Sequence, residues 1–279
     1  MSEALWRFLP FRALNAAENM AVDEAVFRLN RREGLPPTLR FYGWRPPAVS
    51  LGYFQKTSRG IDVGACRQAG IDIVRRPTGG KAVLHEHELT YSVVAAADHP
   101  LFTGDITGTY RVVSACIVEA LRRLGLAPEV ACEGRSAAGM PLEGYCFAAP
   151  SRYELLVGGR KICGSAQVRS GGVFLQHGSL LADMDPARTA SVMGVPAGAV
   201  SATTTTLREQ LGRSVGCGEL ARLLREAFED TLGIRLAEGG LSPAEKSLKE
   251  RLIAEKYGRD RWNLEGKTDP GEDAAPAGD

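Results

Sequence analysis

Residues 75–88 read R-R-P-T-G-G-K-A-V-L-H-E-H-E. The adjacent Gly79 and Gly80 let the backbone adopt positive φ, and a ligand can approach their N–H groups with no Cβ in the way. Arg75 and Arg76 supply planar forks of donors for carboxylate, phosphate or carbonyl oxygens. The stretch therefore predicts either a ligand-binding loop or a hairpin turn within a surface charge cluster. Its spacing fits neither a Walker loop nor a dinucleotide-binding fingerprint.

The chain around this loop alternates between strand-like and helix-like patterns. Asn15 and Glu18 have the spacing of a capping box, which predicts a helix to about Asn30. A second helix is expected from about Thr109 to Leu124, because its apolar residues recur at helical spacing. Short apolar runs predict strands at Thr38–Trp44, Ala48–Tyr53, Ile71–Val74 and Leu89–Val94.

Downstream of these elements, Gly158-Gly159 predicts a two-residue hairpin turn. The turn at residues 170–172 leads into one more strand, and from Ala187 onward the pattern is helical. Ser242, followed by Pro243 and Glu245, has the pattern of a helix start. The expected strands are Tyr153–Val157, Arg160–Gly164 and Val173–Leu181, and the main expected helix is Gly218–Leu232.

These elements predict an α/β fold with a mixed, largely antiparallel sheet backed by helices. We expect one catalytic domain over residues 1–201, and a small helical C-terminal segment over residues 202–265 packed on it. The remaining residues, 266–279, are polar and rich in Pro and Gly, which predicts a disordered tail.

The composition excludes several classes of protein. With 279 residues, 44% hydrophobic and 24% charged, the chain is long enough for a sizeable core. A formal net charge of +1 without a basic stripe argues against nucleic-acid binding. No apolar run has the length of a membrane span and no signal peptide is evident, so we expect a cytoplasmic protein. The six cysteines are too far apart for a zinc knuckle or a redox pair.

Cys146 is the candidate nucleophile, although an isolated cysteine is more often structural. A nucleophilic thiol needs a nearby cation, histidine or helix N-terminus that lowers its pKa. Lys161 is the candidate cation, although a lysine on such a strand usually faces solvent. A two-residue turn places it opposite Leu156, on the same face as Glu154 and Cys163.

The order of residues 75–85, R-R-P-T-G-G-K-A-V-L-H, closely resembles the ligand loop of the lipoate-protein ligase, biotin ligase and octanoyltransferase superfamily. It looks most like the lipoate-ligase-like octanoyltransferases of Gram-positive bacteria. Residues 146–167, C-F-A-A-P-S-R-Y-E-L-L-V-G-G-R-K-I-C-G-S-A-Q, are similar to the pattern in which a Lys follows the Cys by fifteen residues. The segments 41–55, 176–179 and 256–263 also fit, so the resemblance covers Leu5 to about Asn263.

The resemblance implies the catalytic-domain fold of the biotin and lipoate ligases, with an apolar tunnel for an eight-carbon chain. Cys146 falls on the acyl-thioester nucleophile, and Lys161 on the lysine that lowers the thiol pKa and exchanges protons with substrate. His85 and His177 are alternative bases, which we rank lower because they match ligand-loop and wall residues. His87 and Glu88 are expected in a solvated turn. The implied substrate-binding residues are Arg75, Arg76, Thr78, Gly79, Gly80, Val83, His85, Gly164, Ser165, Ala166, His177 and Gly178.

The implied reaction is octanoyl transfer from octanoyl-acyl carrier protein to a lysine of the glycine cleavage H protein or of another lipoyl domain. Main-chain N–H groups near Gly79-Gly80 or near Gly164-Ser165 would stabilise the oxyanion. The alternatives are an ATP-dependent lipoate ligase, an octanoyl amidotransferase acting between lipoyl domains, and an acyl-binding module without chemistry. No metal and no cofactor is implied.

The implied partners are proteins with acidic surfaces, and no nucleic acid, membrane or second copy of the chain is expected. Basic side chains near the cleft would steer such partners as a local patch, since the total charge is close to neutral. Scattered solvated charges are the equally weighted alternative. The candidate steering residues are Arg75, Lys81, Arg152 and Arg160.

Overall fold

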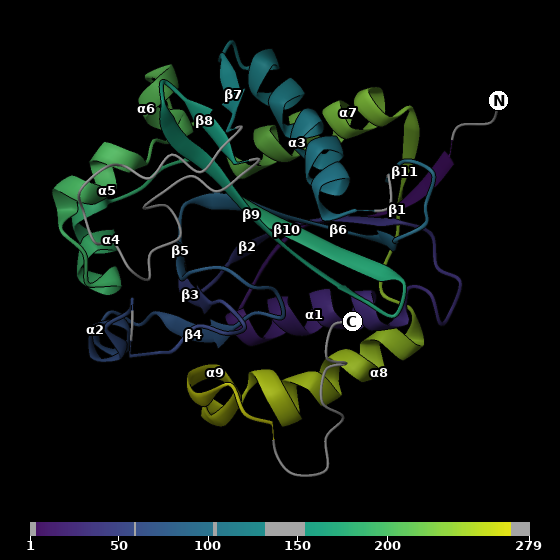
Figure 1. The fold of residues 1–279 in the computed structure, drawn as a ribbon, viewed down its shortest axis with the longest axis horizontal. Helices are drawn as coiled ribbons and strands as arrows, with labels where there is room; N and C mark the ends of the chain where they lie inside the picture. The colour runs from purple at the N-terminus through teal and green to yellow at the C-terminus, as the bar shows by residue number, and fades with distance from the viewer. Residues whose placement is uncertain (1–3, 59, 103–104, 132–153, 269–279) are drawn as a thin grey trace.

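The structure, a computed structural model, describes residues 4–58, 60–102, 105–131 and 154–268. Its centre is an eight-stranded sheet with the order β11-β1-β2-β6-β10-β9-β8-β7, beside a three-stranded sheet with the order β4-β3-β5 (Figure 1). In the larger sheet β1 pairs in parallel with β2 and β11, and the other neighbours are antiparallel. The predicted fold class, a mixed and largely antiparallel sheet backed by helices, is confirmed.

The strands have the following bounds: β1 Ala4–Leu14, β2 Thr38–Trp44, β3 Ala48–Leu51, β4 Asp72–Arg75, β5 Val83–His85, β6 Glu88–Ala96, β7 Pro128–Val130, β8 Leu155–Val157, β9 Arg160–Ser170, β10 Val173–Leu181 and β11 Ile234–Glu238. The helices are α1 Ala16–Leu29, α2 Val63–Gln68, α3 Ile106–Arg123, α4 Pro186–Met193, α5 Ala197–Thr203, α6 Leu207–Leu211, α7 Cys217–Leu232, α8 Pro243–Leu252 and α9 Asp260–Glu265. A π-helical turn, Ile253–Tyr257, joins α8 to the segment before α9.

Local sequence chemistry sets several of these boundaries. The Asn15 side chain accepts from the N–H of Glu18 and the Glu18 carboxylate accepts from the N–H of Asn15, which confirms the capping box of α1. Ser242 and Glu245 cap α8 in the same reciprocal way. The predicted turn at Gly158-Gly159 is also confirmed, with both glycines at positive φ between β8 and β9.

Helices cover both faces of the larger sheet. The main core joins one face to α3 and α7, with Phe41, Tyr91 and Phe174 on the sheet and Ile117 and Phe228 on the helices. The opposite face packs on α1 and on the smaller sheet, and α8 covers the outer side of α1. The sheet therefore presents an apolar face toward α3 and α7 and a second, more polar face toward α1 and the loops of the smaller sheet.

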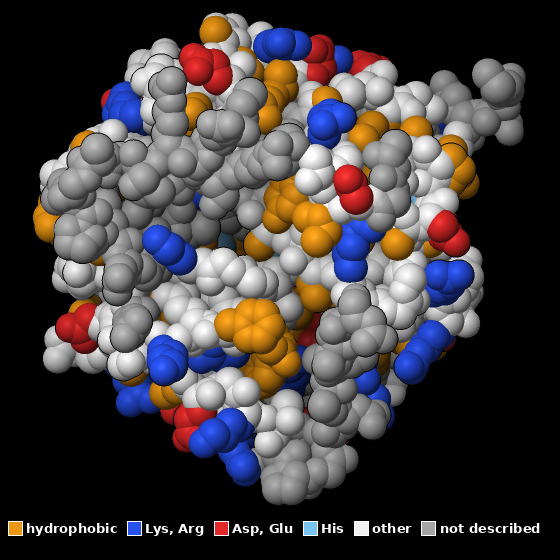
Figure 2. All heavy atoms as spheres, in the orientation of Figure 1, with side chains coloured by type: hydrophobic (Ala, Val, Ile, Leu, Met, Phe, Trp, Pro, Cys, Tyr) orange, Lys and Arg blue, Asp and Glu red, His pale blue; other side chains and the backbone are white. Residues whose placement is uncertain are grey.

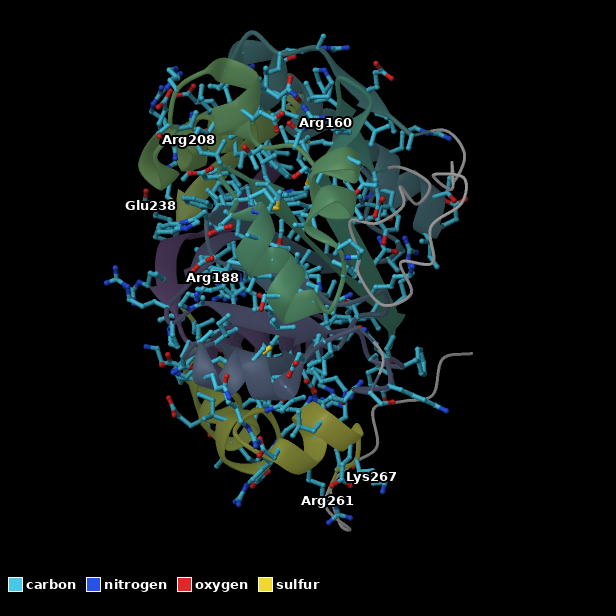
Figure 3. The ribbon with its side chains drawn as sticks, turned by 90° about the vertical axis from the view of Figure 1, so that its left-hand side faces the viewer. Arg160, Arg188, Arg208, Glu238, Arg261 and Lys267 are labelled. Atoms are coloured by element: carbon cyan, nitrogen blue, oxygen red, sulfur yellow. The ribbon has the colours of Figure 1, made fainter. Side chains whose placement is uncertain are left out.

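The C-terminal part of the chain contains helices as predicted, and also a strand that was not predicted. β11 pairs in parallel with β1 over Ile234–Glu238, so residues beyond 201 extend the main sheet. Arg261 and Lys267, in and after α9, lie at the end of the molecule opposite Arg160 (Figure 3). The division into segments at residue 201 stays a prediction, and residues 269–279 of the expected tail lie outside the described part of the chain.

On the surface, charged side chains of both signs surround smaller groups of apolar side chains (Figure 2). Among the described residues, no helix is both long and apolar enough to cross a bilayer.

Candidate active site

The Gly-Gly loop joins β4 to β5, the two outer strands of the smaller sheet. Gly80 has φ of +99°, which confirms positive φ at this position. The backbone of Gly52, just after β3, packs directly against it, and a Cβ at residue 52 would lie 1.8 Å from the carbonyl oxygen of Gly80. The main-chain N–H of Tyr53 donates to the carbonyl oxygen of Thr78 at 2.9 Å. The main chain at Gly52 and Tyr53 therefore holds the loop in place by close contact.

The guanidinium of Arg76 is buried beneath this loop. It donates to the carbonyl oxygens of Gly79 and Lys81, both at 2.8 Å, and to that of Ser50 at 3.0 Å. It also donates to the hydroxyls of Ser50 and Thr78. These contacts hold the loop in shape, and a substrate-binding role for Arg76 stays a prediction.

Arg75 faces the other way, toward the C-terminal segment. Its guanidinium is 2% exposed and donates to the carbonyl oxygens of Gly52 (2.9 Å), Gln55 (2.7 Å) and Trp262 (3.1 Å). It also contacts the carbonyl oxygens of Tyr53 and Leu264 and the hydroxyl of Thr57. All of these hydrogen bonds of Arg75 are therefore to other residues of the chain. The expectation that it steers partners at the surface is wrong, because its side chain is buried, while its assignment to substrate binding stays untested.

The loop meets the polar face of the larger sheet at two points. Oγ1 of Thr78 lies 2.7 Å from Nε2 of His177 on β10. His85, the last residue of β5, contacts Glu88 at 2.6 Å and Ser179 at 3.3 Å. The structure thus brings together Thr78, His85 and His177, three of the predicted site residues.

The His177 ring is held between the loop and helix α1. Its Nδ1 lies 3.3 Å from Oδ2 of Asp23, which also accepts from the hydroxyl of Tyr42 at 2.8 Å. Burial lowers the pKa of His177 and Asp23 opposes this shift, so the ring is neutral, donating to Asp23 and accepting from Thr78. Burial alone would raise the pKa of Asp23, but the charge of Arg40 at 2.6 Å and the donors on His177 and Tyr42 hold it below its usual value.

His85 belongs to a second buried polar group. Its Nδ1 lies 2.6 Å from Oε1 of Glu88, and its Nε2 lies 2.7 Å from Oγ of Ser50. Trp44 stacks on the His85 ring with centroids 4.1 Å apart. The expectation that Glu88 belongs to a solvated turn is wrong: Glu88 is 4% exposed, begins β6, and also accepts from Thr90 at 2.6 Å. His87, in contrast, is exposed as expected.

The predicted residues on β9 and β10 lie opposite one another. His177 pairs with Ala166, Gly178 with Ser165, and Ser179 with Gly164. The Ser165 hydroxyl contacts that of Tyr91 at 2.7 Å, directly across Gly178. A Cβ at Gly178 would lie 2.6 Å from the Ser165 hydroxyl and from the Gly164 carbonyl oxygen, so this crossing requires a glycine.

Lys161 reaches the polar face of the sheet because of an irregularity in β9. Leu156 pairs with Lys161 as predicted, but the next residue of β8, Leu155, pairs with Cys163. Ile162 is therefore the extra residue of a β-bulge. Because Leu155 and Leu156 point to opposite faces, Lys161 and Cys163 do too, and the predicted shared face of this pair is wrong. The bulge places Lys161 on the face that carries Ala166 and His177.

Lys161 is 1% exposed, so the solvent-facing alternative for this lysine is excluded. Its Nζ lies 2.5 Å from Oε1 of Glu154, whose side chain is also buried. The predicted shared face of Lys161 and Glu154 is thus confirmed. The proposed nucleophile, Cys146, lies outside the described residues, as does Arg152.

Cys163 is a poor nucleophile in this position. It is buried against the main core, and burial raises the pKa of its thiol to about 12, although the charge of Lys161 opposes the shift. The four described cysteines, Cys66, Cys116, Cys163 and Cys217, form no disulfide with one another.

Sequence reasoning missed the buried charges that support the histidines. Asp23, Arg40 and Glu88 were not singled out as site residues, although Asp23 and Arg40 interrupt otherwise apolar runs. A charge inside an apolar helix or strand is the signal that would have found these two, because such charges are buried only with partners.

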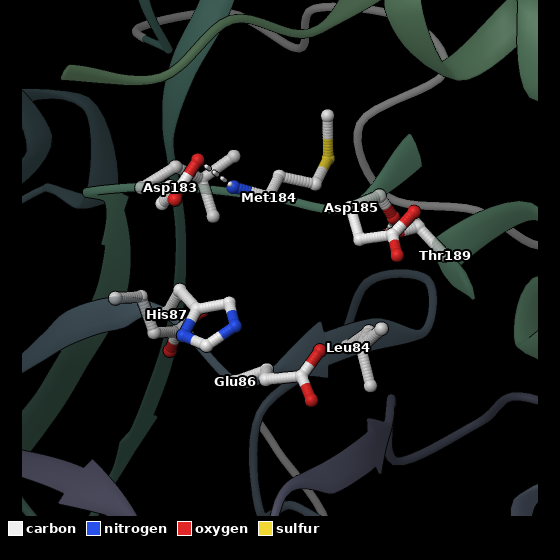
Figure 4. Close-up of a pocket in the computed structure, with 9 residues that line it drawn as sticks. Leu84, Glu86, His87, Asp183, Met184, Asp185 and Thr189 are labelled. Atoms are coloured by element: carbon white, nitrogen blue, oxygen red, sulfur yellow. Dashed lines mark hydrogen bonds between the residues drawn. The ribbon is translucent and has the colours of Figure 1, made fainter. Parts of the chain in front are cut away.

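A surface pocket lies beside β5 and β10, apart from the predicted substrate-binding residues (Figure 4). Its acidic side chains already have partners: Asp183 pairs with Arg208 at 2.8 Å, and Glu86 with Arg188 at 3.1 Å. Asp185 accepts from the first N–H groups of α4. The lining residues are Leu84, Glu86, His87, Glu88, Leu181, Asp183, Met184, Asp185 and Thr189.

Comparison with known proteins shows which family the chain belongs to. Residues 15–229 match the family model of the lipoyl protein ligase A/B catalytic domain. Octanoyltransferase LipM of Kyrpidia tusciae is 43% identical over 92% of this chain and 98% of its own, and the LipM of Bacillus subtilis is 38% identical over 94% and 99%.

Solved structures agree on the architecture. A lipoate-protein ligase A bound with ATP has a TM-score of 0.77, with 28% identity over 94% of this chain and 99% of that chain. A chain from the structure of a bipartite lipoate protein ligase and its E2 lipoyl domain from Thermoplasma acidophilum has a TM-score of 0.76, with 27% identity over 95% and 96%.

The α/β architecture of this chain, with its large and small sheets, is thus shared with these lipoate ligases. The chain belongs to the lipoyl protein ligase A/B catalytic-domain family, and it is an enzyme of the acyltransferase class.

Proposed function

We propose that the chain transfers an octanoyl group from octanoyl-acyl carrier protein, through a thioester on Cys146, to a lysine of a lipoyl domain, that of the glycine cleavage H protein. The observation that carries the proposal is the placement of Lys161. Lys161 is buried, forms an ion pair with a buried carboxylate and lies on the same face of the sheet as His177, and a buried cation is what a thiolate nucleophile requires. The name of the relatives, octanoyltransferase, supports the choice of acyl group.

The proposed reaction has two acyl transfers. In the first, the Cys146 thiolate attacks the thioester carbonyl, a new S–C bond forms and the bond to the carrier sulfur breaks. Lys161 gives its proton to the departing thiolate. Exchange of one thioester for another is nearly isoenergetic, so one difficult aminolysis becomes two easier steps.

In the second transfer, the neutral amine of the acceptor lysine attacks the acyl-enzyme. The C–N bond of the amide forms, and Cys146 leaves as the thiolate. Lys161 takes the proton that the amine loses, so cysteine and lysine both return to their starting charge states. The oxyanion would be bound by main-chain N–H groups near Gly79-Gly80 or near Gly164-Ser165.

Both partners would approach a surface with local rather than global charge. Arg160 is engaged with Glu209 at 2.5 Å, whereas Lys81 is exposed beside the Gly-Gly loop. We expect a modest steering contribution, with a second-order rate that falls as salt is raised.

An ATP-dependent lipoate ligase is the second candidate, because the two solved structures described above are named lipoate ligases. Such an enzyme activates its acid as an adenylate and needs no nucleophilic thiol. An amidotransferase that moves octanoyl groups between lipoyl domains is the third, and it would draw its acyl group only from a modified lipoyl domain.

The test is incubation of the enzyme with octanoyl-acyl carrier protein and apo-H protein, with and without ATP. We expect ATP-independent transfer in the wild type and none in Cys146→Ser, since a serine hydroxyl is far less acidic than a thiol. Intact mass should show one octanoyl group on the wild type after brief exposure to the donor, removable by hydroxylamine. Cys163→Ala is the matched control and should be acylated normally, because that thiol is buried.

Strict dependence on ATP, or full activity of Cys146→Ser, would assign the protein to the ligases. Octanoyl groups taken only from a modified H protein would assign it to the amidotransferases.

A further inference from the structure

The carboxylate of Glu154 forms a buried ion pair with Lys161, the proposed catalytic lysine. Glu154 directly precedes β8, and its Oε1 lies 2.5 Å from Nζ of Lys161. The exposed fractions of the two side chains are 5% and 0%. Both residues extend from the edge of the hairpin toward the polar face of the sheet, where the register pairs Lys161 with Leu156.

The backbone of Lys161 is held independently of this ion pair. Its carbonyl oxygen accepts from the N–H of Thr205 at 2.9 Å, within a parallel bridge to Thr204 on one side, and it pairs with Leu156 of β8 on the other side. Main-chain contacts on both sides therefore fix the Cα position. The direction and charge of the long side chain depend on what surrounds its ammonium group.

A buried ammonium group loses the water that stabilises its charge, so it stays charged only with a close anion or several acceptors. Glu154 supplies the anion. Cys163 is the other titratable group that senses this pair: burial raises its pKa, while Lys161 lowers it and Glu154 raises it again. The pair is thus an electrostatic unit within the site.

We propose that Glu154 is a positioning residue for the acyl transfer, which keeps the side chain of Lys161 protonated and aimed along the polar face of the sheet. The inference rests on the proposed function, because it needs Lys161 to act on a thiolate. It assigns Glu154 no contact with substrate: the carboxylate acts through the lysine alone.

The test compares Glu154→Gln, which keeps the shape and removes the charge, with Glu154→Asp, which keeps the charge on a shorter side chain. The matched control is Glu245→Gln. Glu245 forms an equally buried ion pair with Arg7, through two contacts of 2.7 Å, on α8 at the opposite side of the fold from β8. For each variant, acyl-enzyme formation from octanoyl-acyl carrier protein is measured by quenched intact mass from pH 5.5 to 9.5, together with the thermal midpoint.

For Glu154→Gln we expect acylation at pH 7 to be at least tenfold slower, with the rising limb of the pH profile displaced upward by about one unit or more, equivalent to a tenfold change. Glu154→Asp should restore most of the displacement. Glu245→Gln should lower the thermal midpoint but keep the wild-type profile, which separates loss of a buried ion pair from loss of lysine control.

A Glu154→Gln profile that coincides with that of wild type would overturn the proposal, even if the rate falls with stability. A displacement to lower pH would overturn it too, since Glu154 would then oppose the thiolate rather than support the lysine. If Glu154→Gln does not fold, Glu154→Ala, which also removes the carboxylate, is measured in its place: an upward displacement of the pH profile supports the proposal, and a profile that coincides with that of wild type refutes it. A wild type that forms no acyl-enzyme would instead refute the proposed function.

Discussion

Replacing Arg75 by methionine distinguishes a structural clamp from a substrate-binding residue. In the structure the guanidinium joins the segment after β3 to helix α9, through the carbonyl oxygens of Gly52, Gln55 and Trp262. Trp262 returns a hydrogen bond from its indole N–H to the Arg75 carbonyl oxygen at 3.0 Å. Methionine preserves much of the volume and removes every donor.

The expected loss in the free energy of unfolding follows from the hydrogen bonds that the guanidinium no longer donates. The contacts to Gly52 and Trp262 are fully buried, and each carbonyl oxygen keeps one main-chain donor, from Gln55 and Gly266 respectively. The loss is therefore that of two hydrogen bonds from a charged donor, each of which contributes about 1.5–3 kcal/mol, or about 4 kcal/mol together. The partly buried carbonyls regain water and add little. A loss of that size lowers the thermal midpoint by roughly 8–16 °C in a domain of this class. Differential scanning calorimetry measures it, and hydrogen exchange should rise in residues 260–268.

Arg67→Met is the matched control, because Arg67 also connects the smaller sheet region to α9, through a 3.1 Å ion pair with Asp260 that is largely exposed. Such pairs contribute about 0–1 kcal/mol, so the control should shift the midpoint very little. Arg75→Lys should recover only part of the loss, because one ammonium cannot serve acceptors arranged for a planar fork. The structural role of Arg75 is refuted if the thermal midpoint of Arg75→Met equals that of the Arg67→Met control while its KM for the acyl donor rises.

Two further predictions concern the loop and the buried histidine. Gly52→Ala should lower the thermal midpoint and raise the KM for the donor, because its Cβ would lie 1.8 Å from the Gly80 carbonyl oxygen. The control is Gly218→Ala, in open space on α7, which should change the stability by no more than a gain of about 0.5–1 kcal/mol. Equal stability and KM in the two variants would disprove the close approach. Because burial lowers the pKa of His177 from 6.5, the unfolded chain binds a proton that the fold rejects, so stability should fall as the pH drops below about 6.5, by up to about 1.4 kcal/mol per unit. The free energy of unfolding, measured by denaturant at several pH values, should depend less on pH in His177→Gln. The remaining dependence includes that of His99, whose pKa burial also lowers. An unchanged pH dependence in His177→Gln would show that His177 is charged in the fold.

The elements that sequence reasoning located best are those whose ends are determined by adjacent residues. The capping boxes at Asn15 and Ser242 and the turn at Gly158-Gly159 were all confirmed within a residue or two. Each depends on hydrogen bonds or backbone angles within a few residues, so the sequence contains the whole cause.

Features that depend on distant partners were not predictable in the same way. β11 is a strand because it finds β1, more than two hundred residues earlier. Glu88 looks like a turn residue in sequence, and it is buried because His85, Thr90 and Ser179 converge on one carboxylate oxygen. No residue close to Glu88 in sequence indicates whether its side chain is buried or solvated.

The bulge at Ile162 interrupts the regular alternation of side chains along β9, and this interruption determines which face carries Lys161. With strict alternation, Lys161 would share the face of Cys163, which packs in the main core against α3 and α7. An ammonium group there would meet apolar side chains and would be lost as a charge. One extra residue turns Lys161 to the face where His177, Thr78 and Asp23 already form a hydrogen-bonded network. Lys161 therefore lies on the same face of the sheet as His177 because a single strand departs from regular alternation, and a two-residue period cannot predict that departure.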